Sequence, residues 1–141
     1  MALLSWSDQY SIGNDLIDSE HEELFRLINA FHSQWLQARK QQAIARVLNQ
    51  LVSYTESHFR HEETIMRDEG YVQLDGHMAL HEAMIDTIFQ LQKSYEEGGL
   101  RLEMDTMKFL KSWLLEHILK DDYGFRDFLT RKKSLAGAAV Q

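Results

Sequence analysis

Apolar residues recur every three or four positions along most of this chain, which is the period of an amphipathic α-helix. The clearest stripe begins at His21 and continues through Leu24, Phe25, Ile28, Phe31 and Trp35. Three further segments with this period cover residues 43–69, 74–97 and 102–120. Consecutive helices joined by short connections are usually antiparallel neighbours, so the pattern predicts an all-α, up-down-up-down four-helix bundle.

Turn and capping residues set the expected ends of these helices. An N-terminal arm of eighteen residues leads to Asp18 or Ser19, and either could be the N-cap of the first helix. The polar run 37–42 is a weak break before the second helix, which Gly70 ends as a C′ residue. Gly98 and Gly99 are expected to end the third helix.

The C-terminal part of the chain is expected to leave the regular helical pattern. Gly124 interrupts it and is followed by a short amphipathic segment, residues 125–131. Residues 134–141 are small and weakly polar, which predicts a disordered tail. A chain of 141 residues is within the usual size of one domain. We therefore expect one domain over residues 1–133 and a tail over 134–141.

Composition narrows the class of protein. The chain has no proline, which suits long helices, and no cysteine, which excludes thiolate metal sites, iron–sulfur clusters and disulfides. The net charge of −7 argues against a nucleic-acid partner, because phosphates attract basic surfaces. The chain contains neither a recognisable signal peptide nor an apolar run that could cross a membrane. We expect a cytoplasmic monomer without a membrane partner.

Histidines on the apolar stripes are the strongest functional signal. Five of the seven histidines occupy such positions, namely His21, His58, His77, His81 and His117. Burying each of these imidazoles without a partner would cost ~2 kcal/mol or more, so a shared metal centre is the economical explanation. Five imidazoles and two carboxylates together exceed the four ligands of tetrahedral zinc and the six ligands of one octahedral ion, which predicts two metals bridged by carboxylates.

Periodicity does not decide which residue is the partner of His58 or which is the partner of His117. His61 and Glu62 fit the helical stripe of His58 equally well. Asp121 and Asp122 both follow His117 closely enough to be its partner.

The segments that carry these residues resemble the hemerythrin family, and in particular its bacteriohemerythrins. The resemblance covers nearly the whole chain up to about residue 129. It is carried by Trp6, by Ile17-Asp18 before His21, by His58-Phe59-Arg60-His61-Glu62-Glu63, by His77 with His81, and by Trp113-Leu114-Leu115-Glu116-His117-Ile118 followed by Asp122.

The resemblance implies a complete set of metal ligands, in which Glu62 and Asp122 are the bridging carboxylates and His61 and Asp121 are not ligands. The implied cofactor is a pair of non-heme iron ions with a bridging oxo or hydroxo group. One iron would be held by His77, His81 and His117 and the other by His21 and His58. Dioxygen would bind at the open position of the second iron.

The implied function is reversible dioxygen binding for storage, delivery or sensing, and not catalysis. Four apolar residues near the ligands are expected to line a dry oxygen pocket: Phe59, Trp113, Leu114 and Ile118. Phe125 departs from the family pattern, because many relatives have a tyrosine three residues after the bridging aspartate. Two other functions compete with oxygen binding. One is a di-iron oxidase, peroxidase or nitric-oxide reductase, and the other is a sensory input module of a larger signalling protein.

Overall fold

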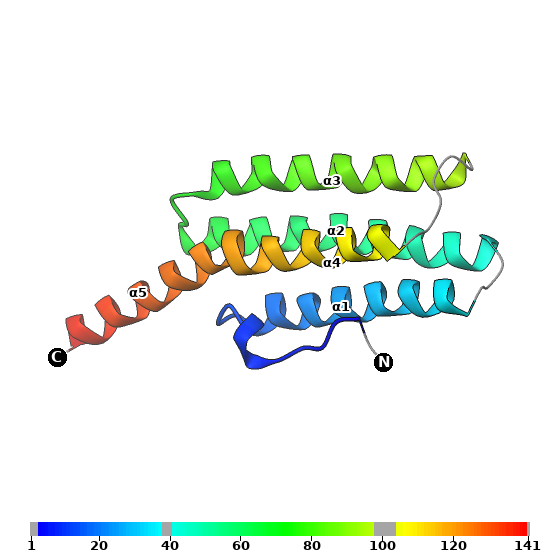
Figure 1. Ribbon diagram of the computed structural model, residues 1–141. Coiled ribbons are helices and arrows are strands. Elements are labelled where there is room, and N and C mark those ends of the chain that lie inside the picture. Colours follow the sequence, from blue (N-terminus) through cyan, green and yellow to red (C-terminus); the bar gives the residue numbers. More distant parts are fainter. Residues whose placement is uncertain (1–2, 38–40, 98–103, 141) are drawn as a thin grey trace.

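Long antiparallel helices form the body of the protein (Figure 1). The computed structural model describes residues 3–37, 41–97 and 104–140, and these contain no strand. Helix α1 spans Asp15–Leu36, α2 spans Gln41–Glu69, α3 spans Leu74–Glu96 and α4 spans Met104–Glu116. Each helix runs opposite to the one before it, which confirms the predicted four-helix bundle. Gly98, Gly99 and part of the predicted break at 37–42 lie outside the described residues.

The N-terminal arm packs along α1 and is tied to its first turn (Figure 1). The Asp18 carboxylate accepts a hydrogen bond from the backbone N–H of Ile12 at 2.9 Å. Because Asp18 holds the arm, another residue caps the helix: the Asn14 side chain accepts from a backbone N–H of the first turn at 3.0 Å. The prediction of Asp18 or Ser19 as N-cap is therefore wrong, since α1 begins several residues earlier.

The last third of the described chain is one continuous helical run. A π-helical segment, η2 at His117–Asp122, joins α4 directly to α5 at Tyr123–Val140. The predicted interruption at Gly124 is wrong, because this glycine lies within α5. Helix α5 projects beyond the bundle (Figure 1), whereas the composition of residues 134–141 predicts a disordered tail. The alanines of that segment favour a helix, since alanine has the highest helix propensity.

Two apolar clusters form the core. The larger lies between the helices and includes Leu24, Ile28, Leu51, Leu114 and Ile118, and the smaller consists of Ile12, Ile17, Met66 and Phe125. On α1 the predicted ligand His21 lies between Ile17 of the smaller cluster and Leu24 of the larger one. Apolar side chains therefore lie on both sides of the predicted ligands along the length of the bundle.

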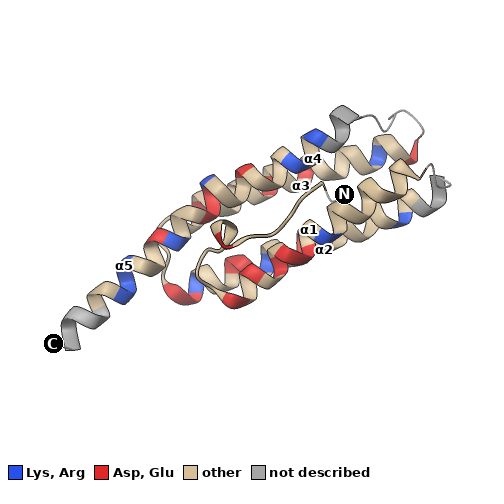
Figure 2. Ribbon diagram, turned by 60° about the horizontal axis from the view of Figure 1, so that its bottom comes forward, with Lys and Arg blue, Asp and Glu red and all other residues tan. Residues whose placement is uncertain are grey.

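Acidic residues are spread along α1 and α2 (Figure 2), in keeping with the net charge of −7. Gly70 follows α2 with a φ of +76°, in the left-handed region that favours glycine, which confirms the predicted end of that helix. Among the described residues, no helix is both long enough and apolar enough to cross a membrane.

Candidate metal centre

Glu62 is at the centre of a buried cluster of imidazoles. Its Oε1 lies 2.7 Å from His77 Nε2 and 3.0 Å from His81 Nε2. Its other oxygen, Oε2, lies 3.1 Å from His58 Nε2 and 3.3 Å from His21 Nε2. All five side chains are almost completely buried. The two oxygens of this carboxylate therefore face two different pairs of histidines.

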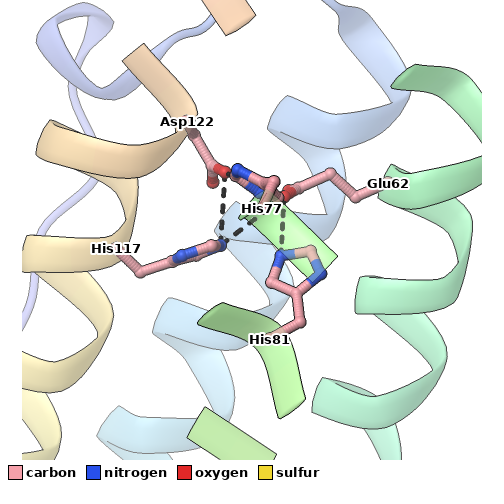
Figure 3. A group of neighbouring side chains, drawn as sticks. All are labelled: Glu62, His77, His81, His117 and Asp122. Carbon is pink, nitrogen blue, oxygen red and sulfur yellow. Dashed lines mark hydrogen bonds and ion pairs between the residues drawn. The ribbon is translucent and has the colours of Figure 1, made fainter. Parts of the chain in front are cut away.

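Asp122 repeats this arrangement from the opposite side of the bundle (Figure 3). Its Oδ1 lies 3.1 Å from His77 Nε2 and 3.2 Å from His117 Nε2. Its Oδ2 lies 3.0 Å from His21 Nε2. His117 Nε2 is also 3.5 Å from Glu62 Oε1, so this histidine belongs with His77.

The seven predicted ligands fall into two groups that share Glu62. In the first group, one ligand atom from each residue lies within 4.8 Å of all the others, and its members are Glu62, His77, His81, His117 and Asp122. The second group meets the same limit and contains His21, His58 and Glu62. Three imidazoles thus gather on one side of the carboxylates and two on the other.

The helix geometry explains how the last segment supplies two members of the cluster. Residues five apart in an α-helix point about 140° away from each other, so an ordinary helix would separate His117 from Asp122. The π-helical η2 has i→i+5 hydrogen bonds, which bring these two side chains to one face. Asp121 instead lies 3.1 Å from Nδ1 of His117, on the outer side of that ring.

His61 lies outside the cluster. Its side chain is 54% exposed, and its Nδ1 is 2.7 Å from Glu20 Oε2. Of the two residues that periodicity could not separate, the structure brings Glu62 into the buried cluster and leaves His61 at its edge.

Two carboxylates that the sequence analysis missed contact the outer nitrogens of buried histidines. Glu20 Oε1 lies 3.0 Å from His58 Nδ1, and Glu63 Oε2 lies 2.7 Å from His81 Nδ1. Both acids are largely buried. The sequence carries no signal for them, because each is a direct neighbour of a predicted ligand and adjacent residues point to different faces of a helix.

The donor atoms of this cluster fit a metal centre. Six inward-facing atoms are buried without a hydrogen-bond partner among the described residues: His21 Nε2, His58 Nε2, Glu62 Oε2, His117 Nε2 and both carboxylate oxygens of Asp122. An unsatisfied buried group costs about 1–3 kcal/mol, so this concentration needs a shared partner. Imidazole nitrogens and carboxylate oxygens are suitable ligands for iron.

Without bound metal, the carboxylates keep several imidazoles protonated. Burial opposes the charged form of His58, but Glu20 and Glu62 outweigh it and raise its pKa to about 9. Burial is likewise outweighed at His77, where Asp122 and Glu62 raise the pKa to about 9. Burial also favours protonation of Glu62, yet the surrounding histidines hold its pKa well below the usual range. A metal that takes neutral imidazoles as ligands must therefore displace protons.

Three of the four predicted pocket residues are buried. The Phe59 ring is stacked on the His81 ring, with centroids 3.9 Å apart and an angle of 2° between the planes. Leu114 and Ile118 are buried in the larger apolar cluster. Trp113 is only partly buried, and it lines a groove with residues of α3 and α4 that also reaches His117.

Phe125 is completely buried in the smaller apolar cluster. Its ring makes an edge contact with Tyr71 at 5.2 Å between centroids. The position therefore serves apolar packing at the end of the bundle that lies beyond the ligands.

Comparison with known proteins follows this geometry. Residues 12–129 match the family described as Hemerythrin HHE cation binding domain. A bacteriohemerythrin of Pseudomonas paraeruginosa is 36% identical over 134 residues, which cover 95% of this chain and 86% of that protein. A bacteriohemerythrin of Methylococcus capsulatus is 30% identical and covers 86% of this chain, with 93% of its own length matched.

A more distant relative and a solved structure show the same similarity. The myohemerythrin of Theromyzon tessulatum is 26% identical over 121 residues, covering 86% of this chain and 89% of that protein. A crystal structure of wild-type hemerythrin superimposes with a TM-score of 0.80 at 29% identity. That match covers 86% of this chain and 94% of the crystallised one.

Proposed function

Because the chain belongs to the hemerythrin family, we propose that it binds dioxygen reversibly at a centre of two non-heme iron ions. We assign His77, His81 and His117 to one iron and His21 and His58 to the other. Glu62 and Asp122 are assigned to both irons, because each carboxylate lies close to histidines of both groups. The observation that carries this proposal is the division of each carboxylate between the two groups of histidines.

The ligand set favours iron that binds dioxygen over iron that activates it. Ferritin-like di-iron centres use four glutamates and two histidines, whereas this cluster has five imidazoles and two shared carboxylates. Neutral imidazoles supply less negative charge and stabilise oxidised iron less strongly. Zinc fits nitrogen and oxygen ligands as well, but it has no redox chemistry and could not bind dioxygen in this way.

The residues around the cluster decide where dioxygen fits and what is kept away from it. A ferrous pair bound here supplies the electrons that dioxygen binding requires. The iron held by His21 and His58 would have one histidine ligand fewer than the other, which would leave a coordination position for dioxygen. Phe59, Leu114 and Ile118 keep the surroundings apolar and exclude water, which would otherwise promote irreversible oxidation of the iron.

Oxygen uptake tests this function. The anaerobically reduced, iron-loaded protein is expected to take up one dioxygen for each pair of irons and to release it when oxygen is removed. An oxygen electrode measures uptake, and metal analysis counts the iron. Continuous consumption of dioxygen in the presence of an electron donor would instead support an oxidase or peroxidase and contradict reversible binding.

Leu114 provides a test of the dry surroundings. The side chain is 1% exposed and lies three residues before His117, one turn toward the helix N-terminus, where helical side chains lean. Replacing Leu114 with alanine is expected to speed autoxidation of the oxygenated protein severalfold while iron content is retained, because the new cavity admits water. The cavity should also cost ~2–5 kcal/mol of stability.

The matched control for this variant is Leu110→Ala. Leu110 is equally buried, but it lies one turn farther from His117. It should lower stability by a similar amount without faster autoxidation. If both variants oxidise equally fast, general loosening of the bundle explains the result and the shielding role of Leu114 is wrong.

A further inference from the structure

Glu20 is held between two histidines, one buried and one exposed. Its Oε1 lies 3.0 Å from Nδ1 of His58, and its Oε2 lies 2.7 Å from Nδ1 of His61. Both oxygens are therefore engaged, and only 8% of the residue is exposed. The carboxylate comes from α1, whereas both histidines come from α2, so the contact also ties these helices together.

The two groups of histidines differ in their outer contacts. In the three-histidine group, Glu63 contacts His81 Nδ1 at 2.7 Å and Asp121 contacts His117 Nδ1 at 3.1 Å. In the two-histidine group, His21 Nδ1 is buried without a hydrogen-bond partner among the described residues. The orientation of that group therefore depends on a single outer carboxylate, the one that contacts His58.

We propose that Glu20 is a positioning residue that fixes the ring orientation of His58 in the two-histidine group, and that His61 holds Glu20 in place from the outer side. This inference rests on the proposed di-iron centre and assigns its outer contacts. A ligand histidine that donates its second N–H to a carboxylate has a fixed ring orientation and is a stronger ligand. Loss of such a contact typically lowers metal affinity about 10–100-fold.

His61 thus has a role although it is not a ligand. A glutamate side chain has three rotatable bonds, and one contact leaves it free to turn toward solvent. The second contact, at 2.7 Å from His61, holds the other oxygen so that Oε1 stays on His58. Loss of His61 should weaken the same metal position as loss of Glu20, but less strongly.

Two variants and two controls test the proposal. Glu20→Gln keeps the size of the side chain but removes its charge and one of its two accepting oxygens. His61→Gln removes the imidazole that holds Glu20. Glu22→Gln and Arg67→Gln are the controls, because they change charge at exposed positions of the same helices.

Each protein is loaded anaerobically with ferrous iron and then mixed with a chelator, and the iron remaining per chain is followed over time. In Glu20→Gln, one of the two irons should leave about 10–100-fold faster than in the parent protein, and the other at the parent rate. Anomalous diffraction from a partly depleted crystal should locate the loss at His21 and His58. His61→Gln should accelerate the same iron to a smaller extent, and the controls should match the parent.

The proposal is overturned if both irons of Glu20→Gln leave at the parent rate. It is also overturned if both irons leave faster than in the parent protein and by the same factor, because Glu20 would then support the fold as a whole and not one metal position. A His61→Gln variant that behaves like the controls would overturn the role of His61. Failure of the proposed function would look different. In that case the parent protein itself would not hold two irons, or it would hold them without binding dioxygen.

Discussion

Replacing Glu62 with alanine is expected to remove both metals from the protein. Its two oxygens lie within 3.5 Å of all five inward-facing imidazoles, so no other residue of the described cluster touches as many members. The loss of affinity should exceed the ~10–100-fold that follows loss of an outer contact, because here a shared ligand itself disappears. Iron per chain after anaerobic loading and gel filtration is the measurement.

Glu56→Ala is the matched control for this variant. Glu56 lies on the same helix and is exposed, so its loss should leave two irons per chain. Asp122→Ala should also lose iron, since Asp122 touches three of the histidines. If Glu62→Ala kept two irons with unchanged affinity, the assignment of this residue as the shared ligand would be wrong.

Removal of the metals is expected to destabilise the fold strongly. Metal that binds only the folded protein, at about 1,000 times its dissociation constant, stabilises by about 4 kcal/mol, or about 10–20 °C in melting temperature for a domain of this size. In its absence, the buried carboxylates and imidazoles have only one another as partners, and six of their atoms make no hydrogen bond within the described residues. Thermal melts of iron-loaded and chelator-treated protein, followed by circular dichroism, measure the difference. Equal melting temperatures would contradict a centre built from these residues.

The size of this difference should depend on pH. In the metal-free protein the pKa values of His58 and His77 are raised from 6.5 to about 9. A histidine whose pKa is raised in the folded state contributes its full stabilisation of the fold below pH 6.5, and this contribution is lost as the pH rises through 9. The melting temperature of metal-free protein should therefore fall between pH 6.5 and 9. The melting temperature of the iron-loaded protein should not fall over this pH range, because its imidazoles are neutral ligands. Parallel curves would contradict this expectation.

The four-helix architecture could be predicted because its signal is repeated along each helix. Apolar positions at the helical period, such as Leu24 and Ile28, recur over several turns, and Gly70 marks an end with a backbone geometry that favours glycine. The N-cap of α1 could not be predicted in the same way. Asp18 is a good cap by type, but a tertiary contact with the arm uses its carboxylate.

The centre was predictable in part for a similar reason. His77 with His81, and His58 with Glu62, share the four-residue spacing of one α-helical face. Asp122 breaks that rule, because it reaches the cluster through the π-helical η2, and no local pattern distinguishes a π turn from an α turn beforehand. The resemblance to the hemerythrin family separated Asp122 from Asp121, whereas spacing alone could not.

The outer contacts of Glu20 could not be predicted from the sequence. Glu20 reaches His58 and His61 across two helices, so its role depends on how α1 packs against α2. A carboxylate beside a ligand in the sequence looks like any other acidic surface residue. Such contacts emerge only when the helices are placed together.

A visible absorption spectrum through cycles of oxygenation tests the central proposal most directly. Protein with about two irons per chain is reduced, recorded under argon, exposed to dioxygen and returned to argon. Reversible binding predicts a ligand-to-iron absorption band that appears with dioxygen and disappears under argon over several cycles, with the iron count unchanged. A spectrum that does not respond to dioxygen, or that changes once and never returns, would contradict a reversible oxygen-binding centre.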